Sequence, residues 1–103
     1  MAYILRFVQR YLPAERSRFM ELEAQFAELE RRRPDWPKGR RSQPYAGREQ
    51  TCTLVWECEF PTLAALEAAL ALMACDPEHE RLFREAAPTM TDMYTEIYEV
   101  LPL

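Results

Sequence analysis

The ten residues Thr51–Phe60 (TCTLVWECEF) alternate along their length. Successive side chains of a β-strand point to opposite faces of a sheet, so this alternation predicts a strand with one apolar and one mixed face. The apolar face holds Cys52, Leu54, Trp56, Cys58 and Phe60. The mixed face holds Thr51, Thr53, Val55, Glu57 and Glu59. Pro61 and Thr62 then end the strand, and a helical pattern begins at Leu63.

Three further segments are expected to join the same sheet. Tyr3–Tyr11 alternates with both faces largely apolar, Arg6 excepted, which is typical of a central strand covered on both sides. Thr91–Leu101 alternates as well. Arg40–Ala46 is predicted as a short edge strand, because Pro44 cannot donate a backbone hydrogen bond.

A helical repeat follows the first strand. Apolar residues recur at spacings of three and four after Pro13, which predicts an amphipathic helix that ends at Pro34. Its apolar stripe is Phe19, Leu22, Phe26 and Leu29. Its glutamates are expected on the solvent side; they are Glu15, Glu21, Glu23, Glu28 and Glu30.

Two more helices follow the strand at 51–60. Leu63–Ala74 repeats as an amphipathic helix, with Thr62 as its expected N-cap. Asp76 and Pro77 open a shorter helix that ends before Pro88.

The order is therefore strand, helix, strand, strand, broken helix, strand. This order predicts an α+β fold, the ferredoxin-like βαββαβ arrangement, with a four-stranded antiparallel sheet and helices on one face. A chain of 103 residues suits one domain, which we expect to span 1–103, and an apolar fraction of 49% excludes a disordered chain.

Composition restricts the partners and the compartment. A net charge of −4 argues against attraction to nucleic acid or to an anionic membrane. No apolar run approaches the roughly 20 residues of a membrane span, and no apolar leader follows Met1, so a reduced cytoplasmic protein is expected. One histidine and three cysteines match no zinc spacing, and the chain has no glycine-rich phosphate loop. We therefore expect no metal and no cofactor.

Two helices cover only one face of a four-stranded sheet, so the other face needs a cover of its own. That face is expected to carry one of two apolar sets, Ile4, Val8, Val55 and Ile97, or Leu5, Phe7, Leu54 and Trp56. Either set exceeds the apolar patch that a monomer normally exposes. A second copy of the chain is the simplest cover, which predicts a homodimer with the C-terminal Leu101–Leu103 over the neighbour.

The run Leu54–Glu57, its continuation into the helix Leu63–Ala74, and the helix opening Asp76–His79 resemble the NIPSNAP-like branch of the dimeric α/β barrel superfamily. Other branches of the superfamily share this plan. The resemblance implies a homodimer with a pocket between the sheet and the helices or within the barrel. The resemblance does not imply one particular enzymatic activity.

Four groups of residues are candidates for chemistry. His79, the only histidine, is a candidate base, or simply an exposed residue. Arg6 is a candidate partner for strand carboxylates, which either transfer protons or form structural ion pairs; they are Glu57, Glu59, Glu96 and Glu99. The aromatic residues either line a pocket or pack in a core; they are Tyr45, Trp56, Tyr94 and Tyr98. The basic segment 31–41, with Trp36 inside it, either binds RNA or a phosphate, or completes a helix end and a solvated loop.

Three functions stay open. The leading expectation is a homodimer that binds a small hydrophobic or aromatic ligand in a cavity by the sheet. The second is a cofactor-independent monooxygenase or isomerase that uses Arg6, Tyr98 and a glutamate, with or without His79. The third is a structural or partner-binding dimer with a filled interior.

Overall fold

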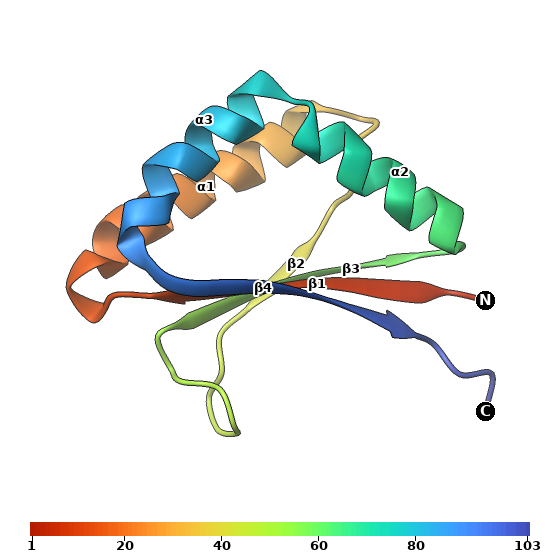
Figure 1. Cartoon of the computed structure of the whole chain (residues 1–103), viewed down its shortest axis with the longest axis horizontal. Coiled ribbons are helices and arrows are strands. Elements are labelled where there is room, and N and C mark those ends of the chain that lie inside the picture. Colours follow the sequence, from red (N-terminus) through yellow and green to blue (C-terminus); the bar gives the residue numbers. More distant parts are fainter.

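The computed structural model describes residues 1–103 as one sheet with helices on one side (Figure 1). The strands are β1 (Tyr3–Tyr11), β2 (Arg40–Ser42), β3 (Thr53–Phe60) and β4 (Met90–Glu99). The helices are α1 (Arg16–Arg32), α2 (Leu63–Ala74) and α3 (Pro77–Ala86), with 3-10 turns η1 (Pro13–Glu15) and η2 (Ala87–Thr89). The strand order is β2-β3-β1-β4, and each neighbouring pair is antiparallel. This is the predicted ferredoxin-like α+β fold.

The element boundaries follow the predicted start and stop signals, with two corrections. The Thr62 hydroxyl accepts a hydrogen bond from Ala65 N at 3.1 Å, and the Asp76 carboxylate accepts one from His79 N at 2.9 Å, so both expected N-caps are present. The edge strand β2 ends at Ser42, not at Ala46, because Pro44 cannot continue the hydrogen-bond ladder. β3 begins at Thr53, two residues later than expected.

The strand register decides which face the helices cover. Leu5 lies opposite Cys58 and Ile97, and Phe7 lies opposite Trp56, so these side chains share one face. Leu5 and Trp56 belong to the main core cluster with residues of all three helices. One of the two predicted apolar sets is therefore the core itself.

The opposite face is less apolar than predicted. Ile97 does not lie there, because the register places it on the helix side. Val8 and Val55 do lie there, but they are only 1% and 5% exposed within a single chain. The loop after β2 passes below this face (Figure 1), where Glu49 pairs with Arg10 at 2.8 Å. Long polar side chains and this loop therefore cover much of the face.

The prediction for the glutamates of α1 is wrong at two positions. Glu23 and Glu30 are each 8% exposed and lie on the buried side of α1. Burial of a carboxylate requires a partner, and Arg41 of β2 supplies one to both. None of the three helices has the length and apolar character needed to cross a membrane.

Candidate functional site

A cavity of about 170 Å³ lies between the sheet and the helices. Its floor on the sheet is formed by Arg41, Trp56, Phe7, Gln9 and Met93, one or two from each strand. Its roof and walls are formed by Glu23, Phe26, Glu30, Trp36, Met73, His79 and Phe83. The lining is mostly apolar with a few convergent polar groups, which is the usual composition of a small-molecule site.

Three residues of the floor form a row across three strands. Arg41 of β2 lies opposite Trp56 of β3, which lies opposite Phe7 of β1. The rings of Phe7 and Trp56 stack with centroids 5.1 Å apart. Antiparallel neighbours at this spacing interact directly, so the row is a continuous surface that is apolar at one end and charged at the other.

Trp56 is held in place at its polar edge. Its Nε1 donates to the Glu30 carboxylate at 3.2 Å, and the backbone N of Gly39 donates to the same oxygen at 3.2 Å. A Cβ atom on Gly39 would lie 1.8 Å from Trp56 Nε1, so only glycine lets the backbone approach the indole this closely. The position of the indole in the cavity therefore depends on three separate chain segments: β3, which carries Trp56, α1, which carries Glu30, and the segment before β2 that contains Gly39.

A buried ionic cluster closes the charged end of the cavity. The guanidinium of Arg41 donates through Nε to Glu23 Oε1 at 2.6 Å and through its terminal nitrogens to Glu30. Burial raises the pKa of Glu23; the charge of Arg41 opposes this effect, and that of Glu30 adds to it. Glu23 is thus the carboxyl group of the cavity that most readily holds a proton.

His79 lies in the cavity wall, not on the solvent side. Its ring meets Phe26 edge-to-face at 5.1 Å and lies 5.8 Å from the ring of Trp36. Burial lowers the pKa of His79, and the charge of Glu30 opposes this only in part. The imidazole is therefore neutral at pH 7.

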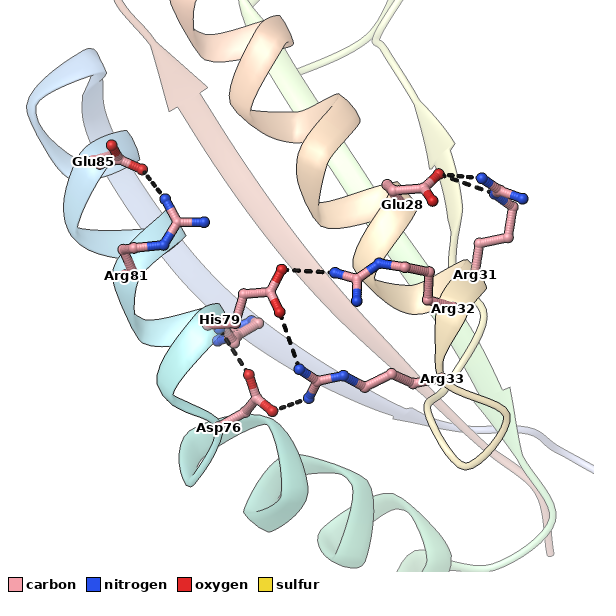
Figure 2. Close-up of polar contacts among 9 residues, drawn as sticks. Glu28, Arg31, Arg32, Arg33, Asp76, His79, Arg81 and Glu85 are labelled. Carbon is pink, nitrogen blue, oxygen red and sulfur yellow. Dashed lines mark hydrogen bonds and ion pairs between the residues drawn. The ribbon is translucent and has the colours of Figure 1, made fainter.

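Ion pairs between α1 and α3 fix the backbone that carries His79. Arg33, just after α1, reaches across to the carboxylate of Asp76, which also caps α3 (Figure 2). Arg33 and Arg32 both contact Glu78, at 3.1 and 2.7 Å. The predicted basic segment is thus largely engaged with acidic side chains of the same chain, which favours its structural interpretation.

Four other predicted site residues, Arg6, Glu57, Tyr94 and Tyr98, lie on the opposite face of the sheet. Arg6 forms ion pairs with Glu57 and Glu96, each at 3.3 Å, and its guanidinium lies 5.5 Å from the ring centre of Tyr98. Tyr94 donates its hydroxyl to the Glu49 carboxylate. Arg6, Glu57 and Tyr98 therefore form one polar group, and Tyr94 belongs to a second one around Glu49 and Arg10. The sheet separates both groups from Trp56 and His79.

Tyr45 belongs to neither group. It lies in the loop between β2 and β3 and is 97% exposed. The sequence interpretation thus joined residues that the structure divides among the cavity, the opposite face and a loop.

Sequence reasoning missed Glu23, Glu30 and Gln9 as cavity residues, and it identified Arg41 only as part of the basic segment 31–41. One signal was present. Glu23 lies four residues after Phe19 and Glu30 four residues after Phe26, so both fall on the same side of the helix as the apolar stripe. For Gln9 and Arg41 the only signal for a place in the cavity was the alternation of side chains between the two faces of a strand. That alternation identifies the helix-covered face only when the strand register is known. No group of three or more His, Cys, Asp or Glu side chains is placed to hold a metal ion.

No protein-family model matches the chain, and no curated protein matches its sequence. Solved structures do match its fold. A NIPSNAP family protein from Agrobacterium tumefaciens superposes with a TM-score of 0.78 at 8% identity, over 98% of this chain and 87% of that one. An uncharacterized NIPSNAP domain protein from Burkholderia xenovorans gives 0.77 at 12% identity, over 99% and 96% of the two chains. An antibiotic biosynthesis monooxygenase gives 0.70 at 16% identity, over 99% and 100%. The chain therefore shares the fold of these proteins, the ferredoxin-like α+β arrangement that its sequence indicated.

Proposed function

We propose that the protein is a homodimer that binds a small, mostly apolar ligand in the cavity between the sheet and the helices. The observation that carries this proposal is the cavity itself, which has aromatic walls and a few polar groups at one end. An apolar cavity of about 150 Å³ is large enough for benzene, so a volume of about 170 Å³ suits a single ring with a short substituent.

The chain contains a direct reporter of occupancy. Trp36 and Trp56 are its only tryptophans, and both line the cavity. A ligand that enters should change the intrinsic fluorescence of one or both indoles. We would titrate the protein with single-ring compounds of different charge (benzyl alcohol, benzylamine, benzoate) and expect saturable binding of at least one.

Two variants, one inside the cavity and one outside it, separate cavity binding from surface binding. Met93 lines the cavity, whereas Ile97 lies on the same side of the same strand outside it and is 48% exposed. Met93→Phe combined with Gln9→Phe should fill the cavity and abolish saturable binding. Ile97→Phe should leave the affinity unchanged. If no compound binds the unmodified protein, or if the filled variant binds as well, the proposal fails.

Dimerisation is proposed through the face opposite the helices. Tyr98 on this face is 45% exposed, and Leu101 and Leu103 in the C-terminal tail are 62% and 107% exposed, so apolar area is left uncovered in a single chain. Sedimentation velocity at micromolar concentration should give a dimer. Tyr98→Asp combined with Leu101→Asp should dissociate it, while Leu63→Asp, on the helix side, should not. A compact monomer of the unmodified chain would contradict this part of the proposal.

A second candidate function, acid–base catalysis on the bound ligand, is favoured by His79. A neutral imidazole and a carboxyl group with a raised pKa, Glu23, line the same cavity, and such a pair offers a proton acceptor and a proton donor to a bound molecule. This candidate corresponds to the isomerase expectation, with Glu23 in place of Arg6 and Tyr98. Mass spectrometry and NMR of a bound compound would show its conversion, and His79→Gln should stop the conversion without loss of binding. A compound that stays unchanged in all variants would leave binding as the function.

A further inference from the structure

The charges that line the cavity do not balance. Two carboxylates, Glu23 and Glu30, face one guanidinium, that of Arg41, and all three are largely buried. His79 adds no charge, because it is neutral at pH 7. When both carboxyl groups are ionised, the lining carries one negative charge in excess, and a buried charge without a partner is unfavourable.

The other basic residues nearby are already engaged. The ammonium of Lys38 donates to three main-chain carbonyls at the end of α1, those of Glu30, Arg33 and Trp36. The guanidinium of Arg33 pairs with Asp76. Neither cation donates a hydrogen bond to the side chain of Glu23.

Two oxygen atoms of the cavity lining accept no hydrogen bond from the protein, Glu23 Oε2 and Gln9 Oε1. Glu30 accepts from Trp56, Gly39 and Arg41. Glu23, in contrast, accepts only from Arg41 and only at Oε1, which leaves Oε2 without a donor. Its side chain is 10% exposed, so water has little access to it. The Oε1 atom of Gln9 is buried and has no partner either. A ligand that complements this lining donates hydrogen bonds.

The rest of the lining suits a positive charge. Five aromatic rings surround the space, those of Phe7, Phe26, Trp36, Trp56 and Phe83. The face of an aromatic ring attracts cations, and the attraction is strongest for tryptophan and in sites shielded from water.

On these grounds, and resting on the proposed function, we infer that the cavity selects a small organic cation, a protonated amine carried on one ring or on an alkyl group of similar size, over neutral and anionic molecules of the same shape. Glu23 receives the ammonium group, and the aromatic walls surround the apolar part. Arg41 is shared between the two carboxylates, and Glu30 has Trp56 and Gly39 as further donors, so Glu23 is the carboxylate that the ligand completes.

The principal competitor is a neutral donor such as an alcohol or phenol, bound while Glu23 is protonated. The two cases differ in their pH dependence. A cation binds best to ionised Glu23, so its affinity should rise as the pH is raised through the pKa of Glu23. The affinity of a neutral donor should stay constant or fall. The other titratable and charged groups of the cavity lining are Glu30, His79 and Arg41.

The test uses three probes of nearly equal size on the intact protein, with tryptophan fluorescence as the readout. Benzylamine is a cation at neutral pH, benzyl alcohol is neutral and benzoate is an anion. We expect benzylamine to bind at least tenfold more tightly than benzyl alcohol, and benzoate to bind more weakly than either. Glu23→Gln should weaken the binding of benzylamine at least tenfold and should change the affinity for benzyl alcohol less than twofold.

Retained binding of benzyl alcohol shows that the variant still has its cavity, so a loss confined to benzylamine is not a folding defect. Glu21→Gln is the matched control: it removes the same charge from the same helix at a side chain that is 63% exposed, and it should change neither affinity. Benzyl alcohol or benzoate binding as tightly as benzylamine would overturn the inference and leave the proposed function intact. If none of the three probes binds, both the inference and the proposed function are contradicted.

Discussion

The Cα of Gly39 lies against the indole of Trp56, so closely that an added methyl group would lie 1.8 Å from Nε1. Gly39→Ala should therefore push the buried indole aside and break its hydrogen bond to Glu30. Overpacking of this kind costs about 1–3 kcal/mol. Urea unfolding should show the loss of stability, and the emission of the folded protein should shift because Trp56 has moved.

Gly47→Ala is the control for that prediction. Gly47 has φ +143°, so alanine there is strained, but a Cβ atom would meet nothing within 4 Å. Stability should fall without a change in the folded-state emission. A Gly39→Ala variant as stable as the parent, with unchanged emission, would contradict the close packing of Gly39 on the indole.

Arg41 should be the most sensitive charged residue of the chain. Its removal leaves Glu23 and Glu30 buried together without a counter-charge, and breaking a buried pair in this way costs about 3–5 kcal/mol. We expect Arg41→Met to lose this much unfolding free energy at pH 7. The neighbouring Arg40→Met should lose less than about 0.5 kcal/mol, because the side chain of Arg40 is 82% exposed. Equal effects of the two substitutions would argue against the buried cluster.

The raised pKa of Glu23 makes stability depend on pH in a defined direction. The folded state binds this proton more tightly than the unfolded state does, so the contribution is fully present below the usual value of 4.5 and is lost as pH rises through the folded pKa. Glu23→Gln should remove this slope and should gain stability over the parent as pH rises toward 7. Unfolding free energies measured by urea from pH 4 to 7 test the sign; a variant that loses stability on the alkaline side would refute it.

His79 makes the stability depend on pH in the opposite direction to Glu23. Burial lowers its pKa, so its contribution is present above the usual value of 6.5 and is lost as pH falls through the folded pKa. Glu23 changes the stability with pH in the opposite direction. The contribution of His79 is therefore measured as the difference in unfolding free energy between the parent and His79→Gln. That difference should shrink as pH falls from 7 toward 5. A difference independent of pH would mean that the imidazole is hydrated in the folded protein.

Asp76 links the end of α1 to the start of α3 through two separable interactions. Asp76→Asn should keep the cap on His79 N and lose only the ion pair with Arg33, whereas Asp76→Ala should lose both. An N-cap is worth about 1 kcal/mol, so the alanine variant should be less stable than the asparagine variant by about that amount. Thermal unfolding of the two proteins measures the difference. Identical melting curves would show that the cap contributes nothing.

Much of this fold follows from local physics and could be predicted from the sequence. Alternation over Thr51–Phe60 and the three-and-four spacing after Pro13 identified strand and helix, because each periodicity places apolar groups on one side. Thr62 and Asp76 marked helix starts because their side chains satisfy free backbone donors. These signals depend on residues a few positions apart, so the sequence by itself determined the order of elements and the α+β class.

The candidate site required the tertiary structure. Glu23 and Glu30 are charged, so their residue type predicts the solvent side even though their spacing places them near the apolar stripe. Their burial is stabilised by ion pairs with Arg41, which lies on an edge strand of the sheet. Likewise Arg6 and Trp56 look like neighbours in a predicted pocket, but the register puts them on opposite faces. Charge pairing and register act between segments far apart in the chain, so no local pattern of the sequence specifies them.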